Sequence, residues 1–313
     1  VVISGVDQVS DSAWTSHTGN IYRTTTTLPV ATYSDQGFLA NQVFVNGVMM
    51  TEARWPNNVG SLTVPTLAGG GISDGEGLNS TVANNDIPIL ADWDGATVWG
   101  NEWFISRAGT ITGGNGGPSG ALTAVMTASI FRGDYWFYLS GKLGLLDAAK
   151  EWFYDNSSHT LSLWAPAGGA PVGVEVKRRN FAFDLSGRSY ISLLNVNIFA
   201  ATITTSDASQ NIVIDGLQAS YISHHVTLPE FPSAKRALGA DGLWILSSHA
   251  DDTGIMLRGT GNILRNSTIA FSSGNGVWLE GSGLVVENYT IHDVNYQSSY
   301  AAAVFFGGMY SRA

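Results

Sequence analysis

A short pattern recurs through the C-terminal half of the chain and constrains its fold more than any other feature. In each copy an Asn or Gly precedes an apolar residue by three positions, within the segments 191–198, 212–219, 266–269 and 288–291. The recurring positions, spaced about 21 to 26 residues apart, are Asn195, Gly216, Gly242, Asn266 and Asn288. A repeat of this length without helical signals is typical of a solenoid, because each coil exposes hydrophobic faces that only the next coil can cover.

A second segment repeats with the same period and predicts which side chains face the core. Residues 253–259 match residues 275–281, and residues 303–307 form a looser third copy. Strand alternation places one set inward, namely Ile255, Leu257, Val277, Leu279, Val304 and Phe306. It places Met256, Trp278 and Phe305 outward, one above another. We also expect the repeated Asn residues of the first pattern to form a hydrogen-bonded ladder along the solenoid.

The remaining signals are those of an all-β chain. Short runs rich in Val, Ile, Thr and aromatic residues alternate with clusters of Gly, Asn, Asp and Ser, and helical patterns are nearly missing. The leucine spacing of leucine-rich repeats is also missing. The architecture that fits is a right-handed parallel β-helix, whose handedness follows from the known architecture and not from the repeat itself.

The chain divides into three parts by pattern. Residues 1–59 are expected to form early β-helix coils with a hairpin at 43–48, and residues 60–134, with their glycine runs, a β-rich insertion. Residues 135–313 are expected to form regular coils, with a second hairpin at 151–164. Because neither end carries a capping element, we expect the sequence to be a section of a longer protein.

Composition excludes several classes of function. The 313 residues contain 15 Lys plus Arg against 25 Asp plus Glu, a net charge of −10, which argues against a general binder of nucleic acids or anionic membranes. The absence of cysteine excludes disulfides, thiolate nucleophiles and Cys-ligated metals. No apolar run is long enough to span a membrane, and no signal peptide stands at the start. Low Lys with abundant Ser, Thr, Gly and Trp leads us to expect an extracellular protein.

Several segments together resemble a known group of enzymes. They are residues 1–7, residues 42–47 running into Ala-Arg-Trp-Pro-Asn at 53–57, residues 146–155 with 161–166, and residues 289–296. In this order they resemble the β-helix carbohydrate-active enzymes, secreted glycoside hydrolases related to fucosidase-, xylanase- and xylosidase-type glycosidases. The resemblance spans nearly the whole chain and implies a β-helix fold, but it says less about the substrate, because such folds host many activities.

Glycoside hydrolysis requires two carboxyl groups that face one bond, one protonated and one ionised. The repeat alignment places the loops 246–252 and 292–300 at the same corner of the solenoid, two coils apart, so that acids from both loops can face a shared notch. The predicted catalytic acids are Asp251 or Asp252 from one wall and Asp293 from the other. We expect His249 and His292 to bind sugar hydroxyls or to tune the pKa of these acids.

Further residues are candidates for substrate binding. Flat aromatic rings beside polar groups suit sugar rings, and the candidates are Trp55, Trp278, Tyr296 and Tyr300. The polar candidates near the same face are Asp241, Arg258 and Glu280. The paired histidines 224 and 225 are assigned a loop role in preference to a metal site.

The predicted function is therefore a secreted glycoside hydrolase that acts on a carbohydrate polymer or oligosaccharide without a cofactor. One alternative is a polysaccharide lyase, which removes a proton beside a uronate carboxylate and could bind Ca²⁺ through oxygen ligands such as Asp241, Asp251 and Asp252. Another alternative is a non-catalytic glycan-binding or fibrous scaffold. Nothing in the pattern indicates an oligomeric state.

Overall fold

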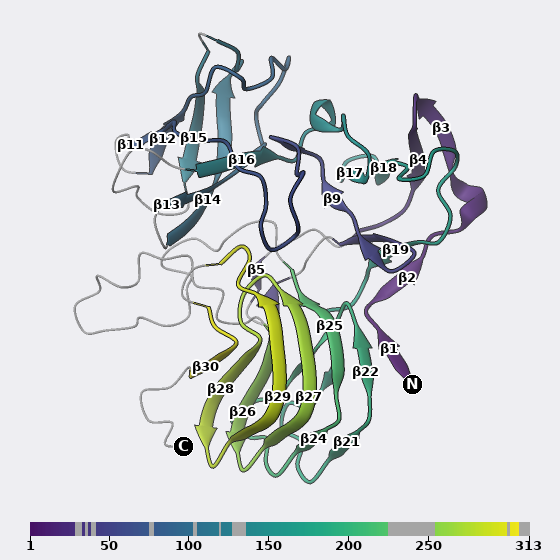
Figure 1. Ribbon diagram of the computed structural model, residues 1–313, viewed down its shortest axis with the longest axis vertical. Coiled ribbons are helices and arrows are strands. Elements are labelled where there is room, and N and C mark those ends of the chain that lie inside the picture. The colour runs from purple at the N-terminus through teal and green to yellow at the C-terminus, as the bar shows by residue number, and fades with distance from the viewer. Residues whose placement is uncertain are drawn as a thin grey trace.

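The computed structural model describes residues 1–28, 33–34, 37–38, 42–74, 78–102, 105–118, 120–126, 136–224, 254–298 and 301–306. Within these residues the chain is almost entirely β-structure, and its helical content consists of the 3-10 turns Asp11–Ala13 and Leu143–Leu145. Figure 1 shows parallel strands from the C-terminal half stacked side by side, with sheets from the N-terminal half above them. The predicted all-β class is confirmed.

Two parallel sheets form the C-terminal half. The first contains β1 (Val2–Ser4), β22 (Asn197–Phe199), β25 (Gln218–Ser223), β27 (Ile263–Ser272), β24 (Val213–Asp215) and β21 (Ser192–Leu194), with β29 (Val285–Val294) paired to β27. The second contains β20 (Phe181–Asp184), β23 (Thr202–Thr204), β26 (Ile255–Thr260), β28 (Val277–Ser282) and β30 (Val304–Phe306). Apolar side chains from both sheets pack into one core, which accounts for the fully buried Ile214, Leu257 and Ile269.

The register of these strands confirms the predicted repeat at four of its five positions. Leu194, Asp215, Arg265 and Glu287 pair in parallel succession, so the next residues, Asn195, Gly216, Asn266 and Asn288, occupy equivalent positions. The ladder is present in part, since Asn288 Nδ2 donates to Asn266 Oδ1 (2.6 Å) and Asn266 Nδ2 to Asp215 Oδ1 (2.7 Å). Gly242 lies outside the described residues, and its predicted place in the repeat is wrong, because Asp215 pairs directly with Arg265 and leaves no coil between Gly216 and Asn266.

The predicted column of outward side chains is present, but it is buried. Met256 pairs with Trp278 and Trp278 with Phe305, whose ring stacks on Trp278 at 4.8 Å. Met256 and Trp278 are nearly inaccessible to solvent. Alternation fixes the side of the strand on which a residue lies, and it does not determine whether another segment covers that side. Phe306, predicted to point inward, is 54% exposed because β30 is the last strand described in its sheet.

The N-terminal half forms mainly antiparallel sheets. The largest contains β10 (Arg54–Trp55), β16 (Trp136–Ser140), β13 (Thr97–Glu102), β14 (Ile105–Gly114), β15 (Leu122–Met126), β12 (Asn79–Val82) and β11 (Ile72–Asp74). A second contains β3 (Thr15–Thr18), β4 (Ile21–Thr25), β18 (Thr160–Trp164), β17 (Glu151–Asp155) and β9 (Thr51–Glu52), with β17 and β9 parallel. Smaller sheets contain β2 (Val6–Gln8), β19 (Val174–Lys177), β7 (Val43–Val45) and β8 (Val48–Met49), and the pair β5 (Tyr33–Ser34) and β6 (Gly37–Phe38).

The structure moves the start of the regular coils. Residues 136–177, predicted to belong to them, form β16 to β19 in the antiparallel sheets, and the continuous parallel sheets begin at β20. Alternating side chains look the same in parallel and antiparallel strands, so the pattern could not separate the two. The predicted hairpins are confirmed as β7–β8 and β17–β18.

Candidate functional site

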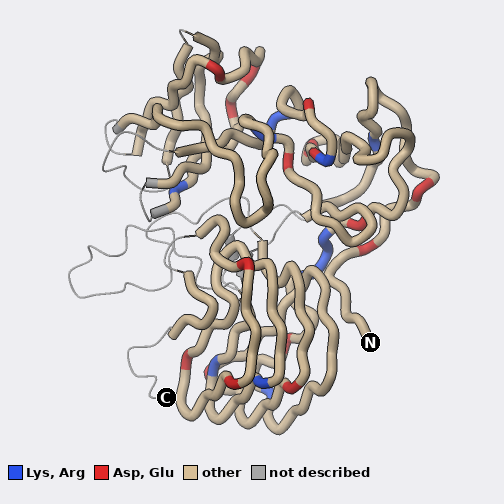
Figure 2. The backbone as a smooth tube through the Cα atoms, in the orientation of Figure 1, with Lys and Arg blue, Asp and Glu red and all other residues tan. Residues whose placement is uncertain are grey.

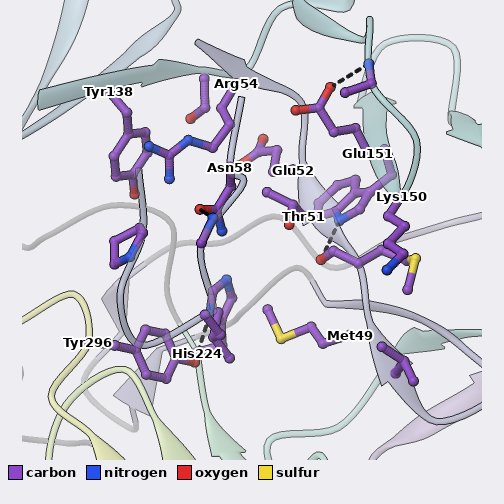
Figure 3. A pocket seen from close by; sticks show the side chains of 18 of the residues that line it. Met49, Thr51, Glu52, Arg54, Asn58, Tyr138, Lys150, Glu151, His224 and Tyr296 are labelled. Atoms are coloured by element: carbon purple, nitrogen blue, oxygen red, sulfur yellow. Dashed lines mark hydrogen bonds between the residues drawn. The ribbon is translucent and has the colours of Figure 1, made fainter. Parts of the chain in front are cut away.

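A cavity of about 430 Å³ lies where the antiparallel sheets meet the parallel sheets (Figure 3). Its volume is in the range of small-ligand sites. The parallel sheets and the loops that follow them contribute a group of mainly aromatic lining residues, Tyr221, His224, Phe271 and Tyr296. The antiparallel sheets and their turns contribute the charged ones, Glu52, Arg54, Lys150 and Glu151. Figure 2 agrees with this division, because the parallel sheets carry most of their charged residues at the end away from the antiparallel sheets.

An unusual backbone conformation brings a column of side chains to this cavity. Ser220, Ala270 and His292 pair in register, and the residues that follow them, Tyr221, Phe271 and Asp293, all have left-handed φ angles of 54°, 59° and 54°. This conformation is rare for residues other than Gly, Asn and Asp, and it interrupts the alternation of side chains along a strand. Such local strain is found preferentially at functional sites.

The aromatic part of this column forms one wall of the cavity. The rings of Tyr221 and Phe271 stack at 4.6 Å with an interplanar angle of 12°, and the edge of the stack meets His292 at 6.1 Å from Phe271. One face of each stacked ring is therefore covered. The Tyr221 hydroxyl is hydrogen-bonded to the backbone of Met49, another residue of the cavity lining.

Asp293 continues the column beyond Phe271. Its Oδ2 lies 2.7 Å from Nδ1 of His292, and both side chains are partly exposed. Burial raises the pKa of the Tyr221 hydroxyl, and the negative charge of Asp293 adds to the rise, which places this carboxylate within electrostatic reach of the cavity wall. Neither Asp293 nor His292 lines the cavity, but His292 packs against the edge of Phe271, which does.

Glu52 is the acid that faces the cavity from the opposite group of sheets. It ends the short strand β9, whose neighbour β17 pairs Trp152 with it in parallel register. Burial raises the pKa of the half-buried Glu52 carboxyl to about 7. A carboxyl group in this environment holds its proton near neutral pH, which is the property that a general acid requires.

Arg54 and Tyr138 form a stacked pair beside Glu52. The guanidinium carbon of Arg54 lies 3.8 Å from the centre of the Tyr138 ring, a cation–π arrangement. Arg54 Nε also donates to the Pro56 carbonyl (3.0 Å), and Nη2 donates to the Thr66 carbonyl. Burial raises the pKa of Tyr138, so its hydroxyl stays protonated. The pair is fixed in position by these contacts.

Glu151, the other acid of the cavity, holds the local backbone in place. Its buried carboxylate accepts hydrogen bonds from the backbone N–H groups of Asp147 (3.4 Å) and Ala148 (3.3 Å). Burial raises the pKa of Glu151 to about 7, and the hydrogen bonds from these amides oppose part of the rise. We assign Glu151 to the structure of the turn that precedes β17.

His224 and Tyr296 close the side of the cavity formed by the parallel sheets. His224 Nδ1 lies 3.0 Å from the Tyr296 hydroxyl, which also donates to the Ser223 carbonyl at 3.3 Å. Tyr296 is buried, and burial raises its pKa well above the ordinary value. Tyr296 is the predicted substrate-binding residue that the structure places directly in the cavity wall.

The other predicted site residues lie elsewhere. Glu280 accepts from Trp278 Nε1 (3.3 Å) and pairs with Arg258 (3.3 Å) in the second parallel sheet, so these three residues bind one another instead of lining the cavity. Trp55 packs into the core of the largest antiparallel sheet, 5.9 Å from Phe137. The remaining candidates fall outside the described residues, namely Asp241, His249, Asp251, Asp252 and Tyr300.

The sequence prediction missed the residues contributed by the antiparallel sheets. The available signal was the segment 51–57, in which Glu52 and Arg54 interrupt an apolar strand region of a chain with few charges. Tyr221 and Phe271 gave no signal, because their left-handed backbone is not visible in the pattern. Within the described ranges no group of three or more His, Asp or Glu side chains is arranged to hold a metal ion. In the same ranges no helix has the length and apolarity needed to cross a membrane.

Comparison with known proteins identifies the fold. No protein-family profile and no curated protein sequence matches the chain. Among solved structures, the chain is similar to one described as "Glycoside hydrolase", with a TM-score of 0.53 and 11% identity, over 98% of this chain and 71% of the other. It also matches a structure titled "The complex structure of XylC with xylose", with a TM-score of 0.37 and 12% identity, over 97% of this chain and 45% of the other.

The first of these matches extends over nearly the whole chain and shows that the chain shares the fold of that structure. At 11% identity this similarity is evidence for the fold alone, because one fold can host many activities.

Proposed function

We propose that this protein is a glycoside hydrolase that cleaves a polysaccharide or oligosaccharide in the cavity between its two groups of sheets. The observation that carries the proposal is Glu52, a carboxyl group that lines an approximately 430 Å³ cavity and whose pKa burial raises to about 7. We further propose that the parallel sheets wind as a right-handed parallel β-helix and that the protein acts outside the cell.

Glu52 serves as the general acid in this proposal. Its proton passes to the glycosidic oxygen as the bond to the sugar carbon breaks, and positive charge develops on the sugar ring. Asp293, which follows the ring of the lining residue Phe271 in the same column, supplies the second carboxylate, which stabilises that charge as nucleophile or activates the attacking water. His292, 2.7 Å from Asp293, orients this carboxylate. Asp251 and Asp252 remain candidates for the same role. The proposed reaction requires no cofactor.

Analysis of the products tests the proposal. Purified protein is incubated with a panel of plant, algal and microbial polysaccharides and 4-nitrophenyl glycosides, and reducing sugar is measured together with near-ultraviolet absorbance. We expect reducing sugar without an unsaturated product, and a loss of at least about 100-fold in Glu52→Gln and in Asp293→Asn. Glu287→Gln, at an exposed position of β29, is the matched control and should keep wild-type activity.

Two outcomes would contradict the proposal. An unsaturated, absorbing product would identify a lyase, and the absence of any product from the whole panel would favour a glycan-binding scaffold. Full activity in both Glu52→Gln and Asp293→Asn would leave hydrolysis intact but place the active site away from this cavity.

A further inference from the structure

The segment 296–298 joins the two groups of sheets at the cavity. The Gln297 carbonyl accepts from Trp99 Nε1 of β13 (3.0 Å), and the Ser298 carbonyl accepts from Ser106 Oγ of β14 (3.4 Å). The backbone N–H groups of the same two residues donate to the Ser273 carbonyl of the parallel part (3.2 and 3.1 Å). These backbone contacts fix the segment without any help from the Gln297 side chain.

The Gln297 side chain is only half satisfied. Its Nε2 donates to the Tyr138 hydroxyl oxygen at 3.0 Å, whereas its Oε1 is buried and has no hydrogen-bond partner in the part of the chain that the structure describes. Both residues line the cavity. A buried acceptor without a partner is costly, and in native proteins it is usually met by a ligand or a water.

Tyr138 offers the complementary group. Its oxygen accepts from Gln297, so its own proton is available for a further acceptor, and burial keeps the hydroxyl in its protonated form. Arg54 covers one face of the ring and holds it in place. Figure 3 shows Tyr138 on the same side of the cavity as Tyr296, the residue that precedes Gln297. An acceptor and a donor therefore stand side by side on one wall.

We propose that Gln297 Oε1 and the Tyr138 hydroxyl together recognise one hydroxyl group of the bound sugar, the first accepting its proton and the second donating to its oxygen. This inference rests on the proposed function and deepens it: the pair selects a sugar that carries a hydroxyl at one ring position and rejects the analogue that lacks it. Sites built to bind a substrate hydroxyl discriminate strongly, because their buried polar groups are left unpaired by the wrong ligand.

Monodeoxy substrates test the inference. The 4-nitrophenyl glycoside that the wild type hydrolyses fastest is compared with its monodeoxy analogues. For one analogue we expect kcat/KM to fall at least about 100-fold in the wild type. In Gln297→Met and Tyr138→Phe, kcat/KM for the parent substrate should fall at least about 10-fold. The further fall in kcat/KM caused by that deoxygenation should be smaller than in the wild type by a similar factor. For deoxygenation at the other ring positions, the fall in kcat/KM should be the same in the variants as in the wild type.

Tyr289→Phe, a change at an exposed tyrosine of β29, is the control and should keep the wild-type deoxy profile. The melting temperature of each variant confirms folding. If both cavity variants fold and keep the wild-type profile while hydrolysis continues, the recognition pair is wrong and the proposed function stands. If the wild type hydrolyses no glycoside, calorimetry with free monosaccharides decides: at least about 10-fold weaker binding in Gln297→Met supports the pair, and unchanged binding or no binding overturns it.

Discussion

Phe271 and Asp293 occupy equivalent positions on β27 and β29, between the pairs Ala270–His292 and Ser272–Val294, and both have a left-handed backbone, with φ angles of 59° and 54°. The shared conformation places an aromatic ring of the cavity lining and a carboxylate in one column. Maintaining it costs free energy at both residues, since in this conformation the Cβ atom lies too close to the following carbonyl oxygen. The left-handed backbone of this column therefore lowers the stability of the fold while it sets the direction of these side chains.

The first prediction concerns this strain. Asp293→Gly should be more stable than Asp293→Ala by about 1 kcal/mol, because glycine adopts a positive φ without steric cost and alanine does not. Denaturant unfolding of both variants measures the difference. The same pair of substitutions at Glu287, an exposed position of β29 without a positive φ, should show the opposite order. Equal stability of the two Asp293 variants would mean that the backbone relaxes.

The second prediction concerns the pH dependence of stability at Glu52. Its folded pKa of about 7 lies above the ordinary value of 4.5, so between these values the folded state holds a proton that the unfolded state has released. Stability should therefore fall as the pH rises from 4.5 to 7, by about 1 to 3 kcal/mol. Urea unfolding across this range should show a smaller decrease in Glu52→Gln than in the wild type. An identical decrease in both proteins would show that Glu52 has an ordinary pKa.

Lys177 gives a prediction of the opposite sign. This buried lysine donates to the Ala200 carbonyl, and burial lowers its pKa from 10.5 to about 7. The cost of its charge is fully present below pH 7 and is relieved as the pH rises toward 10.5. Lys177→Met should therefore be more stable than the wild type at pH 6, and the advantage should shrink at pH 9. A variant that is less stable at pH 6 would show that the hydrogen bond outweighs the burial of charge.

The fourth prediction separates the two acids of the cavity. Glu151→Ala should lower stability by about 1 to 3 kcal/mol, because the amides of Asp147 and Ala148 lose the carboxylate that accepts from them. Glu52, for which no such contacts are described, should tolerate Glu52→Ala with a smaller loss. Melting temperatures of both variants compare the two sites. A larger loss for Glu52→Ala would reverse the structural and functional roles assigned here.

The sequence predicted the part of the fold in which neighbouring coils repeat the same environment. The repeat predicted that Asn195, Gly216, Asn266 and Asn288 are equivalent, because residues in equivalent positions of a solenoid occupy similar environments. The additional coil that it predicted at Gly242 is wrong, because a long segment of the chain separates two strands that pair directly. The hairpin β17–β18 was predicted, but residues 136–177 as a whole were assigned to the regular coils, since alternation is common to parallel and antiparallel pairing.

The site was predictable to a smaller extent. Asp293, His292 and Tyr296 belong to the repeating part, and the corner at which they lie follows from the repeat. Glu52, Arg54 and Tyr138 come from antiparallel sheets that meet this corner through tertiary contacts such as the hydrogen bond between Trp99 and Gln297. Periodicity in one segment carries no information about which surface another segment packs against, so these residues required the structure.

The leaving-group dependence of Glu52→Gln tests the central claim most directly. A general acid matters most for a leaving group that needs a proton. Relative to the wild type, kcat/KM of Glu52→Gln should fall at least about 100-fold for an unactivated disaccharide or alkyl glycoside, and by less than about 10-fold for the 2,4-dinitrophenyl glycoside of the same sugar. Equal losses for both leaving groups, or no loss for either, would contradict the assignment of Glu52 as the acid of a glycoside hydrolase.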